Sequence, residues 1–265
     1  MSTLAYTISD SRVMLRRNLK HQLRYPSMTL MLIGMPIVLL LLFVYVFGGQ
    51  LGAGLGAHLG RGAYLDYVIP GLMLVTVAAA VQGTSIMVAM DMTGGSIDRF
   101  RTMAIARASV LTGHVLGSLI QTLAALGVLI GTAFALGFRS TGRPLDWLAA
   151  IGLLTLFAFA FIWLAVALGL AAKSVETASN TPMILFLLVF LSSGFVRTQS
   201  MPEGLRQFAE YQPFSPMVDS VRGLLVSGPV GTHAIFAVAW SVGIALASYL
   251  WAIRLYNRRR AADPS

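Results

Sequence analysis

The sequence predicts an all-α integral membrane protein. We expect six transmembrane helices, an N-terminal amphipathic helix at the membrane interface, and two short outer-side helices before the sixth span. The 265 residues are 57% hydrophobic and only 11% charged, whereas ordinary soluble domains carry about 25% charged residues. Six stretches are apolar enough, and long enough at about 20 residues each, to cross a hydrocarbon core of roughly 30 Å as helices.

The composition also excludes several classes of function. The net charge is +9, but the basic residues are divided among the segments between apolar stretches and form no folded basic face, so no nucleic-acid partner is expected. The chain has no cysteine, which excludes disulfides and thiolate chemistry. Its four histidines lack the spacing of metal ligands, so no metal site is predicted. His114 is interpreted as an interfacial or buried, hydrogen-bonded side chain.

Residues 1–26 are predicted to form a cytoplasmic amphipathic helix. Leu15, Leu19 and Leu23 recur every four residues, and a basic side chain follows each of them. This pattern gives an apolar stripe beside a basic one, which suits a helix lying in the interface near anionic headgroups. A solvated basic tail is the alternative.

The rest of the chain is expected to form a single transmembrane domain within 1–265. The first apolar stretch is too long for a cleaved signal peptide, whose core has roughly 7–15 residues. No charged residue lies deep inside any of the stretches. The spans are predicted at about 28–47, 67–90, 110–137, 147–171, 178–196 and 232–253.

The distribution of Arg and Lys predicts the orientation. With the N-terminus inside, thirteen of the nineteen basic residues fall in cytoplasmic segments and six in outer ones. Cytoplasmic loops carry the excess of positive charge in membrane proteins. We therefore expect a multi-pass protein of a bacterial plasma membrane with both termini in the cytoplasm.

The loop after the second span predicts a short cytoplasmic helix. Ser96 can cap its first turn, where Asp98 is favoured by the helix dipole. Ile97 and Phe100 then share one face, and Arg99 and Arg101 occupy the rest. A short helix with an apolar knob is typical of a docking element for a partner. An ordinary loop with positive charge on the inner side is the alternative.

The segment before the sixth span predicts two short helices. Ser200 and Glu203 match a capping box around Pro202, which places a helix start there. Pro213 prevents that helix from continuing, and Pro216 begins the next one.

Each of these helices has about ten residues and spans roughly 15 Å, half a bilayer at best. The sequence leaves open whether they lie on the outer leaflet or dip into it and return. Asp219 and Arg222 are three residues apart and are expected to pair. The apolar faces are assigned to Leu205, Phe208 and Ala209 in the first helix and to Val218, Val221 and Leu225 in the second.

The chain carries no sequence signal for an energy source of its own. At the nearest dipeptide to a phosphate-binding loop, Lys173-Ser174, alanines occupy both required glycine positions, so no ATP site and no cofactor are predicted on this chain. The lack of a carboxylate deep in a span weakens a proton- or sodium-driven carrier. It also leaves an intramembrane hydrolase without paired acids.

Two motifs carry a family resemblance. Residues 96–107, followed by 110–113, are similar to the cytoplasmic motif of daunorubicin-resistance-type permeases. Residues 193–196, 200–209 and 212–222 resemble their outer-side motif. Ala104 departs from a common proline and His114 from a common arginine. The chain as a whole resembles the permease subunit of a type-2 ATP-binding-cassette (ABC) exporter.

The resemblance implies partners for the docking helix. The permease would pair with itself or with a sister permease, and two cytoplasmic ABC ATPase subunits, which bind ATP and Mg, would dock below. The helix Ile97–Arg101 would seat in a groove of the ATPase. Phe100 would be its packing knob, and Asp98, Arg99 and Arg101 its polar contacts.

The resemblance also implies a role for the two outer-side helices. They would cover the exit and set the outer end of the transport pathway. The residues assigned to them are Pro202, Glu203, Leu205, Phe208, Pro213, Pro216, Asp219 and Arg222.

The expected function is export of a hydrophobic or amphipathic small molecule, such as a drug or antibiotic. One alternative keeps the architecture but changes the cargo to a lipid, a glycolipid or a lipid-linked saccharide. A membrane scaffold that recruits a soluble partner without transport is an alternative from another class. It would use the docking helix but would not need the outer pair.

Overall fold

The computed structural model describes residues 26–47, 61–93, 107–226 and 228–261. The predicted N-terminal amphipathic helix lies outside these residues. So does the predicted docking helix with Ile97, Asp98, Arg99, Phe100 and Arg101. Both therefore stay predictions.

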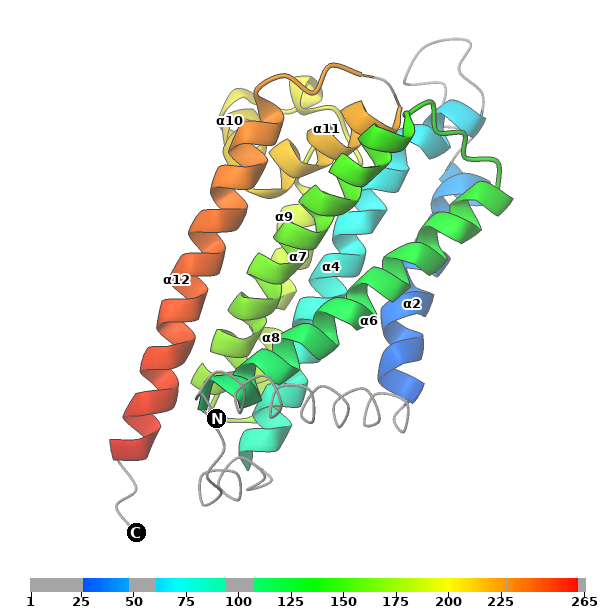
Figure 1. Cartoon of the computed structure of the whole chain (residues 1–265). Helices are drawn as coiled ribbons and strands as arrows, with labels where there is room; N and C mark the ends of the chain where they lie inside the picture. The colour runs from blue at the N-terminus through cyan, green and yellow to red at the C-terminus, as the bar shows by residue number, and fades with distance from the viewer. Residues whose placement is uncertain (1–25, 48–60, 94–106, 227, 262–265) are drawn as a thin grey trace.

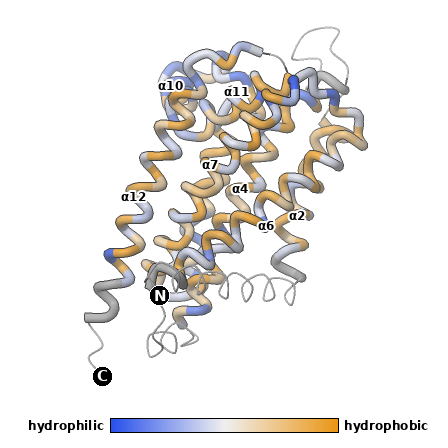
Figure 2. The backbone as a smooth tube through the Cα atoms, viewed as in Figure 1, coloured by the Kyte–Doolittle hydropathy of each residue, from blue (hydrophilic) through white to orange (hydrophobic). Residues whose placement is uncertain are grey.

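Five long helices run side by side through the described part of the chain (Figure 1). Each is apolar and long enough to cross a membrane, and together they cover the first four and the sixth of the predicted stretches. Figure 2 shows hydrophilic colours gathering at the end of the bundle that carries α10 and α11. The five helices are α2 (Pro26–Leu41), continued by the π-helix η1 (Leu42–Phe47), α4 (Arg61–Thr93), α6 (Arg107–Ala135), α7 (Pro144–Ala171) and α12 (His233–Ala261).

The core of the bundle lies between α4 and α7. In the most apolar 18-residue stretch of α4, 72% is buried inside the protein, against 17% in the corresponding stretch of α12. Gly169 of α7 permits the close approach of the two central helices, because a Cβ there would stand 2.7 Å from the carbonyl oxygen of Ser85 and 2.8 Å from Cβ of Val88. Small residues at such crossings let helix backbones meet in lipid.

The predicted fifth span differs from the single helix expected over 178–196. It consists of α8 (Val175–Asn180) and α9 (Met183–Phe190), separated at Thr181 and Pro182. Proline has no N–H with which to continue the helical hydrogen bonds. Ser179, just before this break, accepts a hydrogen bond from Nε2 of Gln82 at 3.0 Å.

The chain turns immediately after α9 instead of continuing as a helix to residue 196. The side chain of Ser192 donates to the carbonyl of Val189 at 2.5 Å and accepts from the backbone N–H of Gly194 at 3.1 Å. These local bonds satisfy polar groups at a helix end that is buried in the bundle. They also place Ser193 at the end of the bundle where α10 and α11 lie.

Two short helices cover that end, preceded by a 3₁₀ turn, η2 (Thr198–Ser200). They are α10 (Glu203–Tyr211) and α11 (Phe214–Leu225), close to the predicted positions. The predicted capping box is wrong, because α10 has no side-chain cap and Pro202 occupies its N-cap. Ser200 belongs to η2, and its hydroxyl donates backward to the carbonyl of Arg197 at 2.7 Å.

His114 lies near the start of α6, at the opposite end of the bundle from α10 and α11. It is 8% exposed, and its Nε2 lies 3.1 Å from Oδ2 of Asp91 at the end of α4. It is therefore a buried side chain in a specific polar contact, as interpreted from the sequence.

Candidate functional site

The helix α11 is buried in the end of the bundle. Nine of its twelve residues are buried, and it packs on α7, α12, α4 and α9. Phe214 packs against both Phe157 and Phe161 of α7, with ring centroids 5.4 and 5.1 Å away. The helix α11 therefore packs into the end of the bundle, and its predicted apolar face of Val218, Val221 and Leu225 is buried.

Residues of the loop between α6 and α7 hold the last turn of α11. The carbonyl oxygen of Leu225 accepts from Oγ of Ser140 at 2.7 Å and from the backbone N–H of Thr141 and Gly142 at 3.1 and 3.3 Å. A Cβ at Gly142 would clash with the carbonyl oxygen of Leu224, so this contact depends on glycine. The carbonyls left over at a helix C-terminus are in this way satisfied by a neighbouring segment.

The predicted pair of Asp219 and Arg222 forms. Nη1 of Arg222 lies 2.7 Å from Oδ1 of Asp219. Both side chains are mostly buried: the exposed fraction is 20% for Arg222 and 26% for Asp219. The spacing of three residues places the two charges on one side of α11, as the helix geometry requires.

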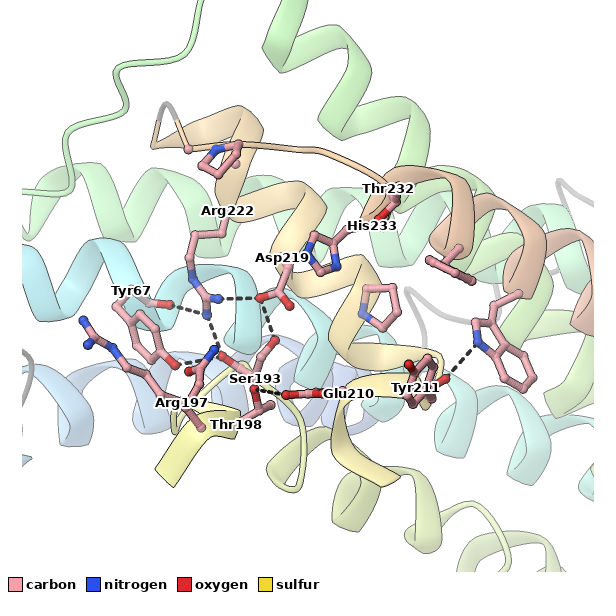
Figure 3. A pocket seen from close by; sticks show the side chains of 17 residues that line it. Tyr67, Ser193, Arg197, Thr198, Glu210, Tyr211, Asp219, Arg222, Thr232 and His233 are labelled. Carbon is pink, nitrogen blue, oxygen red and sulfur yellow. Dashed lines mark hydrogen bonds and ion pairs between the residues drawn. The ribbon is translucent and has the colours of Figure 1, made fainter. Parts of the chain in front are cut away.

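Arg222 also joins α11 to two distant segments (Figure 3). Its Nη2 donates to the carbonyl oxygen of Ser193 at 2.7 Å and to that of Tyr67 in α4 at 3.2 Å. Its Cζ lies 4.1 Å from the centroid of the Tyr67 ring, which is cation–π geometry. One guanidinium therefore contacts α4, the turn after α9 and its own helix.

Ser193 completes this arrangement, which we call the Arg222 cluster: Tyr67, Ser193, Asp219 and Arg222. The hydroxyl of Ser193 donates to Oδ1 of Asp219 at 2.7 Å, and its backbone N–H donates to Oγ of Ser215 at 3.0 Å. The hydroxyl of Tyr67 donates to the carbonyl of Ser193 at 3.0 Å. The bonds made by Arg222 and Asp219 are charge-assisted, and such bonds are stronger than neutral ones. Nε of Arg222 is buried without a hydrogen-bond partner among the described residues.

Burial lowers the pKa of Arg222, and the nearby Tyr67 and Asp219 partly offset this effect by favouring the charged form. A guanidinium stays protonated even so, because its ordinary pKa is far above neutral pH. The positive charge is therefore kept inside the protein. Its stability depends on the partners that surround it.

A close contact of two glycines holds the cluster together. A Cβ at Gly71 would stand 2.9 Å from the carbonyl oxygen of Gly194, and a Cβ at Gly194 would stand 2.9 Å from Cα of Gly71. The turn after α9 therefore rests directly on the backbone of α4, one turn from Tyr67. Any side chain at either position would move Ser193 away from Arg222.

The helix α10 is far more exposed than α11. Its predicted apolar side chains Leu205 and Phe208 are 39% and 49% exposed, and only Ala209 is fully buried. Glu210 accepts from Nε of Arg206 at 2.8 Å and from the hydroxyl of Thr198 at 3.2 Å. The bond from Arg206 is the main cause that lowers the pKa of Glu210.

A cavity of about 1040 Å³ lies between the Arg222 cluster, α10 and the start of α12 (Figure 3). The cluster forms one wall, and Arg197 also lines the cavity. The opposite wall is aromatic, with Tyr211, Phe236 and Trp240. Nε1 of Trp240 donates to the carbonyl of Tyr211 at 3.0 Å, which ties α12 to the end of α10.

The residues assigned to the two short helices are therefore not brought together in one site. Asp219 and Arg222 belong to the cluster, and Pro216 lines the cavity beside them. Pro202 and Pro213 are the N-cap residues of α10 and α11. Glu203, Leu205 and Phe208 lie exposed on α10.

Sequence reasoning missed the roles of Tyr67 and Ser193. Their contacts with Arg222 span 155 and 29 residues along the chain, beyond the reach of any local pattern. One signal was available, because a tyrosine at the beginning of an apolar span commonly directs its hydroxyl toward a polar partner. Among the described residues, no group of three His, Cys, Asp or Glu side chains could hold a metal ion.

Comparison with known proteins identifies the family. Residues 10–226 match the model of the ABC-2 type transporter family. The chain is 29% identical over 239 residues to a daunorubicin resistance ABC transporter permease protein of Streptomyces coeruleorubidus, an alignment that covers 89% of this chain and 82% of that protein.

Two further relatives fit the same picture. A probable doxorubicin resistance ABC transporter permease protein of Mycobacterium tuberculosis is 28% identical over 212 residues, covering 78% of this chain and 75% of that protein. ABC transporter G family member 20 of Dictyostelium discoideum is 27% identical over 191 residues, which are 71% of this chain but 25% of that protein.

Bacterial relatives named as ABC permeases and five membrane-length apolar helices together indicate a multi-pass protein of the plasma membrane. The family implies an ABC ATPase as partner. Because the family match extends over most of its length, this chain belongs to the ABC-2 type transporter family.

Proposed function

We propose that this chain is the permease subunit of an ATP-driven exporter that moves hydrophobic or amphipathic small molecules, such as drugs or antibiotics, out of the cell. The observation that carries the proposal is the alignment with a daunorubicin resistance permease over 89% of the chain. The alignment is long enough to include apolar helices of the bundle as well as α10 and α11. A scaffold would need only the docking element, so this extent favours transport.

The energy comes from a separate subunit. ATP and Mg are bound by the partner ATPase, and this chain has no nucleotide site and no cofactor of its own. Two ATPase subunits bind two permeases, which are identical or sisters. The ATPase subunits contact the segment Ile97–Arg101 of the permease, and Phe100 is the side chain that packs against them.

The α10–α11 end faces the outside, and both termini are cytoplasmic. The distribution of basic residues supports this orientation. The inserted helix α11 then closes the outer end of the bundle. For cargo to leave past it, α11 has to move relative to α4, which requires the bond of Arg222 to the carbonyl of Tyr67 to break.

Transport can be tested in inverted membrane vesicles that contain the chain and its cognate ABC ATPase. We expect ATP-dependent accumulation of radiolabelled daunorubicin or of another amphipathic drug from a panel. The expected accumulation is abolished when the ATPase carries a substitution that prevents hydrolysis. The purified chain alone should not hydrolyse ATP.

The control outcomes separate the alternatives. A scaffold would still bind the ATPase in these vesicles but would move no drug. ATP-dependent transfer of labelled phospholipid without drug accumulation would favour the lipid-exporter alternative. Drug accumulation driven by a pH or sodium gradient without ATP would contradict the proposal.

A further inference from the structure

One face of the segment formed by α8 and α9 is exposed along its whole length. The segment packs beside α4 (Figure 1). Thr181 and Pro182, at the break, both keep right-handed helical backbone angles, so the helical phase continues from α8 into α9. Exposed positions recur at spacings of four and three residues, which places them on one side. This α8–α9 face contains Glu176, Asn180, Met183, Leu187 and Phe190.

The break in this face lies at hydrocarbon depth. The carbonyl of Ser179 accepts from Nε2 of Gln82 at 3.0 Å, so the break stands at the level of Gln82 in α4. Gln82 precedes Asp91, near the end of α4, by nine residues, which is about 13 Å of helix. The hydrocarbon core is roughly 30 Å thick. Asn180 and Thr181, which follow Ser179, therefore lie well inside it.

Lipid contact does not suit the middle of the α8–α9 face. Asn180 and Thr181 are both exposed, and the side chain of Asn180 makes no hydrogen bond to another residue that the structure describes. A free amide in hydrocarbon is strongly unfavourable. Irregular backbone at membrane depth likewise occurs only where protein or a water-filled cavity covers it. The centre of this face therefore requires a cover other than lipid.

The middle of α12 provides a comparison, because its exposed side has the composition that lipid contact requires. Its two serines, Ser241 and Ser248, are 0% and 3% exposed. The exposed positions between them are all apolar: Val242, Gly243, Leu246 and Ala247. Small polar side chains are thus turned inward on α12 and outward on the α8–α9 face.

The two ends of the α8–α9 face favour protein over water as its cover. On α9, Met183, Leu187 and Phe190 are 65%, 52% and 40% exposed, an apolar surface that water would hydrate unfavourably. At the start of α8, Lys173 and Glu176 are exposed and have opposite charges. A two-fold axis along the membrane normal can set Lys173 of one copy against Glu176 of another, and the reverse. The face is therefore complementary to itself.

We propose that the α8–α9 face is the surface on which this permease binds a second copy of itself. The apolar side chains of α9 would pack against those of the other copy. Asn180 would meet the same residue of the other copy near the axis, and such polar contacts hold helices together in lipid. The proposal rests on the proposed function, in which two permeases form the exporter. It assigns the face on which they meet.

Cysteine cross-linking tests the face in a chain that has no cysteine of its own. Leu187→Cys is the test variant, and Leu246→Cys on α12 is its matched control, because the two leucines are 52% and 59% exposed. The full-length chain alone is reconstituted in phosphatidylcholine vesicles and treated with a short bis-maleimide. We expect Leu187→Cys to give a covalent dimer that retains most of its yield when the vesicles are diluted with lipid. Leu246→Cys should give only collisional product, which declines on dilution.

Met183→Cys, one turn away, keeps the test informative if Leu187→Cys does not fold. Yields equal to that of Leu246→Cys, or no dimer from either variant of α9, would overturn the proposal. ATP-dependent drug accumulation is measured on the same variants with the ATPase present. Accumulation without cross-linking would refute the face and leave the proposed function standing. Cross-linking without accumulation of any drug would support the face and contradict the function.

Charge reversal separates a second copy from any other cover of this face. In the Leu187→Cys protein, Glu176→Lys sets like charges against each other across the axis. It should lower the yield of dimer about threefold, the ratio that two exposed ion pairs of ordinary strength would give. Adding Lys173→Glu exchanges the two charges and should restore the yield. Arg254→Glu, at an exposed position of α12, should leave it unchanged. A yield that the double reversal does not restore would overturn the self-complementary arrangement.

Discussion

The neighbouring helices α10 and α11 each contain an arginine–carboxylate pair, and the two pairs have almost the same length. Arg206 and Glu210 are 2.8 Å apart on α10, and Arg222 and Asp219 are 2.7 Å apart on α11. The first pair stands at the surface with a single further partner. The second is mostly buried and bonded to two other segments. Distance alone therefore does not indicate the importance of an ion pair, because desolvation and additional hydrogen bonds decide its energy.

Removing Arg222 should have the largest effect. Arg222→Met leaves Asp219 without its cation and removes two bonds to backbone carbonyls, so we expect the free energy of unfolding to fall by about 3 kcal/mol. Thermal unfolding of the purified chain in detergent measures this loss. Arg206→Met is the matched control and should change stability by less than about 0.5 kcal/mol. Similar losses in the two variants would remove the distinction between the helices.

The glycine contact beneath the cluster should give the next largest effect. Gly71→Ala places a Cβ against the backbone of Gly194, and we expect a loss of about 1–3 kcal/mol from overpacking. Gly83→Ala in the same helix is the control, since its Cβ would have no neighbour within 4 Å. That variant should be neutral or stabilised, because alanine favours the helix by up to about 1 kcal/mol. A neutral Gly71→Ala would show that the turn after α9 can shift freely.

A smaller effect is expected from the hydroxyl of Tyr67. Tyr67→Phe removes its bond to the carbonyl of Ser193 but keeps the ring beneath the guanidinium of Arg222. We expect a loss of about 1 kcal/mol, the usual value for one hydrogen bond. Tyr67→Leu should cost more, because it also removes the cation–π contact. If the two variants unfolded at the same temperature, the ring would make no separate contribution.

The surface pair on α10 should give the smallest effect and a defined pH dependence. Since Arg206 lowers the pKa of Glu210, the stabilisation is present above the ordinary pKa of glutamate and is lost as the pH falls through the lowered value. Glu210→Gln should therefore cost at most about 0.5 kcal/mol at pH 7 and nothing at acidic pH. Unfolding temperatures of both proteins, measured from pH 7 downward through the range in which carboxylates become protonated, test this. A cost that did not decline as the pH falls would have another origin.

The long helices and the Asp219–Arg222 pair could be predicted from the sequence because each depends on local spacing or on the mean hydropathy of a stretch. The rest of the cluster could not, since Tyr67 and Ser193 reach Arg222 only after the chain has folded. The capping box failed for a related reason. Ser200 has the correct spacing to cap α10, but it lies in the 3₁₀ turn η2. There its hydroxyl donates to the carbonyl of Arg197 and does not cap α10.

The difference in burial between α10 and α11 was also beyond local reasoning. Both sequences are amphipathic and contain charges, and both were expected at the membrane surface or dipping into it. α11 enters the bundle because Arg222 and Asp219 find partners on α4 and on the turn after α9. Without these partners the two charges would be buried and compensated only by each other, whereas those of α10 remain at the protein surface.

The break between α8 and α9 has a mechanical consequence. Ser179 on one side is bonded to Gln82 of α4, and Leu188 on the other accepts from Nε2 of Gln212, next to α11, at 2.8 Å. The two halves are thus anchored at different heights of the bundle, with Pro182 between them. Helices bend most easily where backbone bonds are missing. The break at Thr181 and Pro182 is therefore the point at which this segment would bend if its two anchored halves moved relative to each other.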